Sequence, residues 1–333
     1  MYKKFFLILL YSVFVWMLPL GLRADDDSTG TELGEPFIGE LVDVNGRNVL
    51  VHCVGEGSPT IWLENGWAAM VVTWQPFQDQ LAEHTRVCAY DRAGMGWSDP
   101  NGSDRTAYNS AAEFAELLDV LGENEPFIIL AWSCGAPIAQ IYAAQNPDMA
   151  LGLVLMDACG LNYDRWVMET YPFGTWQSPS EQVSWLETVR GYAESAAAGE
   201  LSYDSISWWF NATSSELYGD LYYNLILKNP NYWYTYMWET LYGVMGVNSD
   251  QVKAVITQTD MPITAIIAAD DATADAESQS YAWMFSTAQI ANTTYSNNPS
   301  VIWAETSEHA IFRAEPDTVI NALLDMISEM NDE

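Results

Sequence analysis

Basic residues are scarce in this sequence. Lys and Arg number 12 against 45 Asp and Glu in 333 residues, which gives a formal net charge of −33 at pH 7. A chain of this charge repels nucleic acid and anionic membranes, so no nucleic-acid partner is expected. The acidic residues are scattered along the sequence, and this pattern is typical of a generally acidic surface rather than of a metal site.

Cysteine is also rare, and close pairs of metal ligands are missing. None of the four cysteines, Cys53, Cys88, Cys134 and Cys159, has a nearby partner at zinc-site spacing, so no metal is expected. Cys53 and Cys88 lie in apolar runs and are predicted to be buried free thiols, although export would permit disulfides. Residues 55–57 lack the spacing of a dinucleotide loop, so no cofactor is expected.

Only one long apolar run exists, and it lies at the start of the chain. Residues 5–20 are uncharged and follow Lys3 and Lys4, which is the layout of a secretory signal peptide over residues 1–24. The alternative is an uncleaved N-terminal membrane anchor. Cleavage would remove Lys3, Lys4 and Arg23, take the formal charge from −33 to −36, and release a secreted or periplasmic protein without stable membrane insertion.

Residues 25–35 are polar and predict a loose leader, and residues 36–333 predict one α/β domain. Asn45-Gly46 between two apolar runs indicates a β-hairpin. Apolar strand-like runs then alternate with stretches of helical periodicity, which predicts a mostly parallel sheet covered by helices on both faces. The final helix is expected to begin near Pro316.

The alternation stops at about residue 160 and resumes at about residue 258. This stretch is rich in aromatic residues and shows no clear strand, so it predicts a helical cap inserted between two strands of one sheet. Its aromatic residues suggest a pocket for an apolar or aromatic group, although core packing is the commoner role of each. They are Trp166, Trp176, Trp185, Trp208, Trp209, Tyr222, Tyr223, Tyr232, Trp233, Tyr234, Tyr236 and Trp238.

Ser133 lies where the strand-like run 126–132 meets the helical run 136–146. A sharp strand-to-helix turn exposes one side chain above the sheet and requires small residues two positions to either side, as Ala131 and Gly135 are. The N-terminus of the following helix would favour negative charge near Ser133. The pattern alone leaves an ordinary loop serine as an equal alternative.

The chain has three histidines, so a base for Ser133 can be sought by elimination. His52 lies within a strand-like run and His84 ends a helical one, whereas His309 follows the last strand-like run at the edge where α/β sites form. His309 is therefore the predicted base, in the order serine, acid, histidine.

An acid must orient the imidazole of His309. Asp271 follows the strand-like run 261–269 and is preferred, with Asp270 as its alternative; Asp275 and Asp157 are more distant possibilities. The backbone N–H groups of Cys134 and Trp67 are the predicted oxyanion donors. The Cys134 thiol itself is expected only to fill space under the turn.

These segments resemble the α/β-hydrolase-fold serine hydrolases of the cap-containing, esterase-like branch. Residues 85–99 (TRVCAYDRAGMGWSD), 152–158 (GLVLMDA) and 307–320 (SEHAIFRAEPDTVI) carry the resemblance, which covers roughly residues 36–333. It implies structural roles for Asp91, Arg92 and Gly94. The chain departs from the family at Ala131, where glycine is usual, and at Asn65-Gly66, where His-Gly is usual.

The sequence thus predicts an exported hydrolase that cleaves a carboxylic ester of an apolar or aromatic small molecule through an acyl-enzyme. The same residues would also serve amide or iminopeptide hydrolysis, acyl transfer, carbon–carbon bond hydrolysis or perhydrolysis. Dehalogenase and epoxide-hydrolase chemistry is disfavoured because it uses Asp at the position of Ser133. A non-enzymatic binding protein is the remaining alternative. The oligomeric state is not predicted.

Overall fold

The structure is a computed structural model, and it describes residues 35–161, 179–202, 205–206, 229–244, 247–269 and 281–332. Its centre is an eight-stranded sheet in the order β1-β2-β4-β3-β5-β6-β7-β8. The strands are β1 (Glu40–Val44), β2 (Arg47–Val54), β3 (Ile61–Glu64), β4 (Val87–Tyr90), β5 (Phe127–Trp132), β6 (Ala150–Met156), β7 (Ile263–Ile267) and β8 (Pro299–Trp303).

Strand β2 is antiparallel to both of its neighbours, and the remaining pairs are parallel. The hairpin predicted at Asn45-Gly46 joins β1 to β2, and both residues have positive φ, 56° and 85°. Positive φ at both central residues is the requirement of the turn that matches strand twist. The predicted mostly parallel sheet is confirmed.

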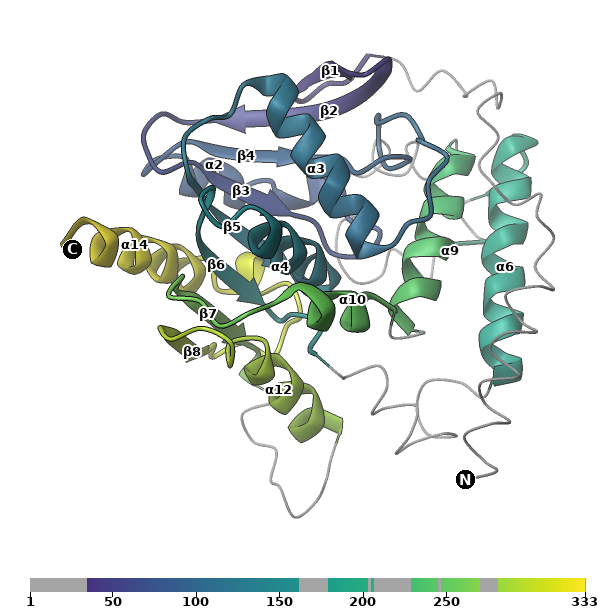
Figure 1. Ribbon diagram of the computed structural model, residues 1–333. Helices are drawn as coiled ribbons and strands as arrows, with labels where there is room; N and C mark the ends of the chain where they lie inside the picture. Colours follow the sequence, from purple (N-terminus) through teal and green to yellow (C-terminus); the bar gives the residue numbers. More distant parts are fainter. Residues whose placement is uncertain are drawn as a thin grey trace.

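Helices cover the two faces of this sheet (Figure 1). One face carries α3 (Ala107–Leu121), α4 (Ala136–Gln145) and α10 (Val247–Val255), which bury Phe114, Ile141 and Val252. The other face carries α2 (Phe77–Leu81) and α14 (Pro316–Asp332), which bury Phe77 and Leu323. The final helix begins at Pro316 as predicted, because proline fits the first turn of a helix.

Four further elements follow or precede the strands named above. A 3₁₀ helix, η1 (Val71–Trp74), follows β3, and another, η2 (Ser133–Gly135), follows β5. Helix α12 (Tyr281–Ala291) precedes β8, and α13 (Ile311–Ala314) follows it.

The predicted insertion between β6 and β7 contains α6 (Pro179–Ala197), α9 (Pro230–Val244) and α10 in its described parts. Figure 1 shows α6 and α9 side by side beyond the carboxyl ends of the parallel strands. In α9, Tyr232, Trp233 and Tyr236 are buried, so these aromatic residues serve packing. The signal segment, the leader and several aromatic residues of the predicted cap lie outside the described residues.

The prediction of free thiols at Cys53 and Cys88 is wrong. The two residues are register neighbours on the antiparallel strands β2 and β4, with Cα atoms 4.1 Å apart, and they form a disulfide. Their distance along the chain, 35 residues, hides this neighbourhood, because strand order is a property of the sheet and not of the sequence.

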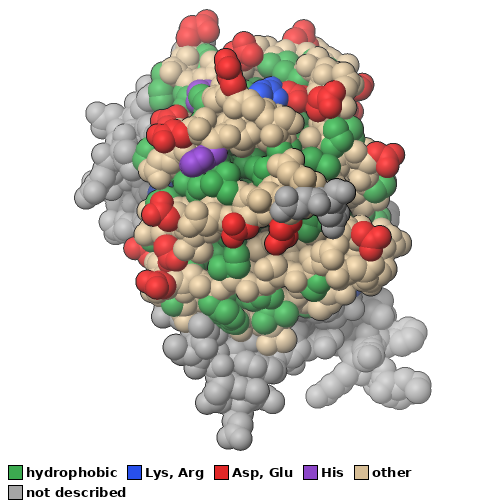
Figure 2. All heavy atoms as spheres, turned by 90° about the vertical axis from the view of Figure 1, so that its left-hand side faces the viewer, with side chains coloured by type: hydrophobic (Ala, Val, Ile, Leu, Met, Phe, Trp, Pro, Cys, Tyr) green, Lys and Arg blue, Asp and Glu red, His purple; other side chains and the backbone are tan. Residues whose placement is uncertain are grey.

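Acidic side chains are spread over the face that is turned to the viewer in Figure 2, with apolar side chains between them and few basic ones. This agrees with an acidic surface. In the part of the chain that the structure describes, no group of three or more His, Cys, Asp or Glu could hold a metal ion, and no helix there has the length and apolarity to cross a membrane.

Candidate active site

Ser133 stands at the turn between β5 and α4, with a left-handed backbone φ of 53°. This conformation is strained for a residue with a side chain, and such strain is concentrated at functional sites. A Cβ at Gly135 would lie 2.5 Å from the carbonyl oxygen of Asn65, so the turn admits only glycine there. Ala131 is completely buried within β5, so alanine fits the position where the related proteins usually have glycine.

His309 lies in the loop between β8 and α13, and its ring reaches Ser133. The distance from His309 Nε2 to Ser133 Oγ is 3.0 Å, which is a hydrogen bond. The indole N–H of Trp132 donates to the backbone oxygen of His309 at 2.9 Å, and the two rings lie 5.2 Å apart. The residue before the serine therefore holds the loop that carries the histidine.

The carboxylate beside His309 is not the predicted one. Asp157 Oδ2 lies 2.5 Å from His309 Nδ1, whereas Asp271 and its alternative Asp270 lie outside the described residues. Asp157 follows β6, which is paired directly with the serine strand β5. The carboxylate in contact with His309 thus follows the strand next to the one that leads to Ser133, and the preference for Asp271 over Asp270 falls outside the described residues and stays a prediction.

Asp157 is itself held in place by a residue that the sequence did not reveal. Its backbone φ is 41°, it is almost fully buried, and its Oδ1 accepts a hydrogen bond of 3.0 Å from Gln289 Nε2. The Gln289 oxygen in turn accepts from the backbone N–H of Ala158 at 3.1 Å. Gln289 lies on α12, 132 residues from Asp157 in sequence. The one signal for it in the sequence is a polar glutamine within an apolar helical run, which is buried in the fold.

Cys134 is bonded to Cys159, so the prediction of a lone space-filling thiol is wrong. Cys134 follows Ser133, and Cys159 lies two residues after Asp157. The backbone N–H of Cys159 also donates to the backbone carbonyl oxygen of Ser133 at 3.0 Å. The turn that carries the serine and the loop that carries the acid are thus joined by a covalent and a hydrogen bond.

The loop after β3 lies against the serine. A Cβ built at Gly66 would be 3.1 Å from the Ser133 Cβ, so the backbone that leads into Trp67 borders Ser133. The Asn65 side chain donates to the backbone carbonyl oxygen of Tyr90 at 2.7 Å and accepts from the Trp74 indole N–H at 2.8 Å. Asn65 therefore fixes this loop through its amide, at the position where the related proteins usually have histidine. The Trp67 and Cys134 donors stay predictions.

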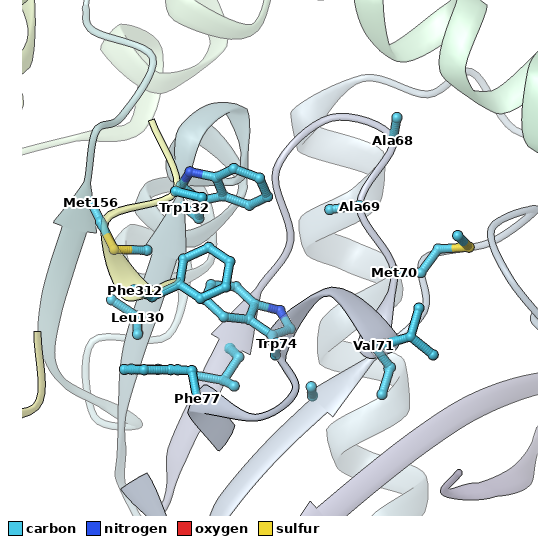
Figure 3. Close-up of a cluster of buried hydrophobic side chains, with 14 of the residues drawn as sticks. Ala68, Ala69, Met70, Val71, Trp74, Phe77, Leu130, Trp132, Met156 and Phe312 are labelled. Atoms are coloured by element: carbon cyan, nitrogen blue, oxygen red, sulfur yellow. The ribbon is translucent and has the colours of Figure 1, made fainter. Parts of the chain in front are cut away.

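An aromatic cluster underlies the site. Trp74, Trp132 and Phe312 come from the loop after β3, from β5 and from the segment after His309. Their rings lie close together in Figure 3, with centroids 4.6 Å apart for Trp74 and Phe312 and 5.2 Å apart for Trp132 and Phe312. Because interiors pack at crystal density, this cluster holds the three loops in fixed relation.

The loop after β4 supports the same region. Asp91 accepts from the backbone N–H of Val71 at 2.7 Å and so ties β4 to η1. A Cβ at Gly94, whose φ is 82°, would lie 2.1 Å from the Thr235 hydroxyl of α9. Glycine is therefore required where the insertion meets the core, which is the structural role that the resemblance implied.

Burial raises the pKa of Asp91 to about 7, although hydrogen bonds from the backbone of Val71 and Trp97 partly oppose this. Between the ordinary value of 3.8 and about 7, the folded protein keeps a proton that the unfolded chain releases. Stability from this group is therefore full below pH 4 and is lost as the pH rises to about 7. The loss approaches about 4 kcal/mol at most.

We expect Asp91→Asn to remove this dependence. Urea unfolding of both proteins at pH 5 and pH 7.5 measures it: the free energy of unfolding of the wild type should fall by more than that of the variant. Other groups titrate equally in both proteins, so they cancel in the difference. Equal changes in the two proteins would show that Asp91 does not titrate in this range.

Comparisons with known proteins agree with this architecture. A family model described as alpha/beta hydrolase fold matches residues 59–289. The 2-hydroxy-6-oxo-2,4-heptadienoate hydrolase of Pseudomonas putida is 28% identical over 130 residues, which are 38% of this chain and 47% of that protein. The chain spans less than half the length of the curated relatives that it matches first.

Solved structures of low identity share the fold. The enol-lactonase of Burkholderia xenovorans LB400 matches with a TM-score of 0.58 at 16% identity, over 87% of this chain and 100% of that one. A Pseudomonas aeruginosa protein that is provisionally assigned as an epoxide hydrolase matches with a TM-score of 0.64 at 16% identity, over 88% and 96%. At this identity the likeness shows the fold and does not identify a substrate.

Proposed function

This chain belongs to the alpha/beta hydrolase fold family, and from that premise we propose that it is an exported serine hydrolase that cleaves a carboxylic ester of an apolar or aromatic small molecule. The observation that carries the proposal is the hydrogen-bonded series from Ser133 through His309 to Asp157. The three residues follow the strands β5, β6 and β8 and meet at the carboxyl edge of the sheet, where α/β folds form their sites.

Each residue of the series has a defined task. His309 Nε2 takes the proton of the Ser133 hydroxyl as the oxygen attacks the ester carbonyl, and it later gives that proton to the leaving alcohol. Asp157 fixes the tautomer and orientation of the imidazole and stabilises its charged form. Water then repeats the sequence on the acyl-enzyme and releases the acid.

The oxyanion of each tetrahedral intermediate needs donors that are already in place. We assign the backbone N–H groups of Trp67 and Cys134 to this task. The proximity of Gly66 to the Ser133 Cβ supports the first donor. The position of Cys134 directly after the nucleophile, at the start of a helix, supports the second.

Export is supported by the cysteines. Both pairs of cysteines form disulfides, and disulfides persist in oxidising compartments outside the cytosol. Together with the signal-like first 24 residues, this favours a secreted or periplasmic protein with a small-molecule substrate.

Carbon–carbon bond hydrolysis is the second candidate. It is favoured by the similarity to the heptadienoate hydrolase of Pseudomonas putida, because the same serine, histidine and acid would serve either bond. A panel of p-nitrophenyl esters, lactones, amides and vinylogous diketones separates the candidates. Turnover of esters or lactones alone supports the first proposal, and turnover of diketones alone supports the second.

A fluorophosphonate probe tests whether the protein is an enzyme at all. We expect the probe to label Ser133, because the neighbouring imidazole activates the hydroxyl. His309→Ala should slow the labelling by about a hundredfold or more. Labelling is measured by intact-protein mass spectrometry and located by peptide mapping. A folded protein that takes no label would instead support a non-enzymatic binding role.

A further inference from the structure

Arg92 connects three elements through one side chain. Its guanidinium is almost fully buried and donates at 2.8 Å to the Glu64 carboxylate, and at 2.6 and 2.8 Å to the backbone carbonyl oxygens of Asn65 and Gly66. It also donates to both carboxylate oxygens of Glu239, at 2.7 and 2.8 Å. A guanidinium carries five N–H donors, so these five bonds account for every one of them.

One of these bonds fixes the direction of a predicted oxyanion donor. The carbonyl of Gly66 and the N–H of Trp67 belong to the same peptide unit, which is planar and trans, so the two groups point in opposite directions. Holding the Gly66 oxygen on Arg92 therefore aims the Trp67 N–H away from Arg92. A cationic donor on the carbonyl also polarises the peptide and strengthens its N–H as a donor.

The partner that orients Arg92 comes from the insertion. Glu239 lies on α9, is 4% exposed and binds the guanidinium in the two-pronged geometry that gives the strongest directional hold. Helix α9 reaches the same loop a second time, because the Tyr232 hydroxyl donates to the Ala68 oxygen at 3.1 Å. The loop around Trp67 is thus held from α9 on both sides of that residue.

The charges of this cluster keep the guanidinium ionised. Burial alone would lower the pKa of Arg92, but the attraction of Glu239, followed by that of Glu64, raises it above its ordinary value. Burial raises the pKa of Glu64, although Arg92 and the hydrogen bond from Tyr90 oppose this. Glu239 is therefore the principal counter-charge of Arg92, and removing it weakens the hold on the guanidinium.

We propose that Glu239 is a positioning residue of the oxyanion hole: through Arg92 it fixes the Gly66–Trp67 peptide, so that docking of α9 and stabilisation of the oxyanion are coupled. The inference rests on the proposed function in one respect, namely that the Trp67 N–H is an oxyanion donor. It adds that a residue of the insertion, without touching the substrate, controls the rate of the chemical step.

Glu239→Gln tests the proposal, and the chain offers a matched control. Glu113 forms another ion pair, with the buried Arg105 at 2.6 Å, and is itself largely covered. Arg105 donates its other hydrogen bonds to Ser110 on α3 and to Asn101 in the loop before it. Glu113→Gln therefore removes an equivalent carboxylate without touching the loop around Trp67. Thermal unfolding should show a comparable loss of stability in both variants, so stability alone cannot explain a difference in rate.

Two measurements distinguish positioning from stability. With active sites titrated by the fluorophosphonate probe, Glu239→Gln should lower kcat for an activated ester by about tenfold or more with KM within about twofold, since removing a whole oxyanion donor costs 10²–10³. The control should stay within about twofold in both constants. Amide hydrogen exchange in residues 65–70 should be faster in Glu239→Gln than in the control.

An unchanged kcat per active site in Glu239→Gln would overturn the coupling, whether or not exchange becomes faster. Equal exchange in the two variants would overturn the hold on the loop. A wild-type protein that turns over no ester would contradict the proposed function instead, and exchange would still decide the hold on the loop. Should Glu239→Gln fail to fold, Tyr232→Phe removes the hydroxyl by which α9 bonds to the Ala68 oxygen, and it is judged by the same two measurements.

Discussion

Replacing Ser133 by alanine is expected to lower ester turnover by about a thousandfold or more. The reason is that the acyl-enzyme cannot form without the Ser133 oxygen, whereas the fold should be unaffected. Only the Ser133 side-chain oxygen is removed, and the left-handed backbone φ of 53° costs alanine about as much as it costs serine. The measurement is the steady-state hydrolysis of a p-nitrophenyl ester by purified protein, with circular dichroism as the check on folding.

Ser103→Ala provides the matched control. Ser103 also uses its hydroxyl in hydrogen bonds, to Asn101 and Glu113, but it lies in the loop before α3. The turnover of this variant should stay within about twofold of the wild type, because both partners of the Ser103 hydroxyl belong to α3 and the loop before it. Undiminished turnover in Ser133→Ala, in a sample free of other esterases, would refute the assignment of the nucleophile.

Asp157→Asn is expected to lower kcat by about a thousandfold or more, with little change in KM. An amide can present its N–H₂ group to His309 Nδ1 and so favour the tautomer that carries its proton on Nε2, which cannot accept from Ser133. In that orientation the amide oxygen would still accept the hydrogen bond that Gln289 Nε2 donates to Asp157 at 3.0 Å, so Gln289 would hold the amide in the unproductive orientation. The measurement is kcat per titrated active site.

Asp271→Asn is the discriminating partner of this experiment. The structure brings Asp157 to 2.5 Å from His309 Nδ1, so we expect Asp271→Asn, and equally Asp270→Asn, to keep kcat within about threefold. If Asp271→Asn instead loses activity while Asp157→Asn keeps it, Asp157 is a structural neighbour of His309 and the original assignment from sequence stands.

The positions of the elements followed from local patterns. The turn at Asn45-Gly46 and the start of the last helix at Pro316 depend on backbone preferences that a few neighbouring residues determine. The alternation of apolar runs with helical stretches similarly implied the parallel sheet. The Ser133–His309 pair was also within reach, because only three histidines had to be considered and one alone lay at the right edge.

The carboxylate that pairs with His309 could not be predicted from a local pattern in the same way. Forty-five carboxylates were available, and Asp157 and Asp271 each follow a strand, so no local pattern could choose between them. The choice depends on which loop brings a carboxylate to the Nδ1 side of His309. In the fold, β6 pairs with β5, and Gln289 of a distant helix holds the Asp157 carboxylate in place.

By itself, then, the sequence determined the fold class, the turn that carries Ser133 and the choice of His309 as its partner, because each depends on local backbone preference or on a scarce residue type. Only the tertiary structure revealed the contact of Asp157 with His309, both disulfides and the contact of Glu239 with Arg92. These join residues from 25 to 152 positions apart. Such contacts depend on strand order and helix docking, which the whole core fixes and no single segment encodes.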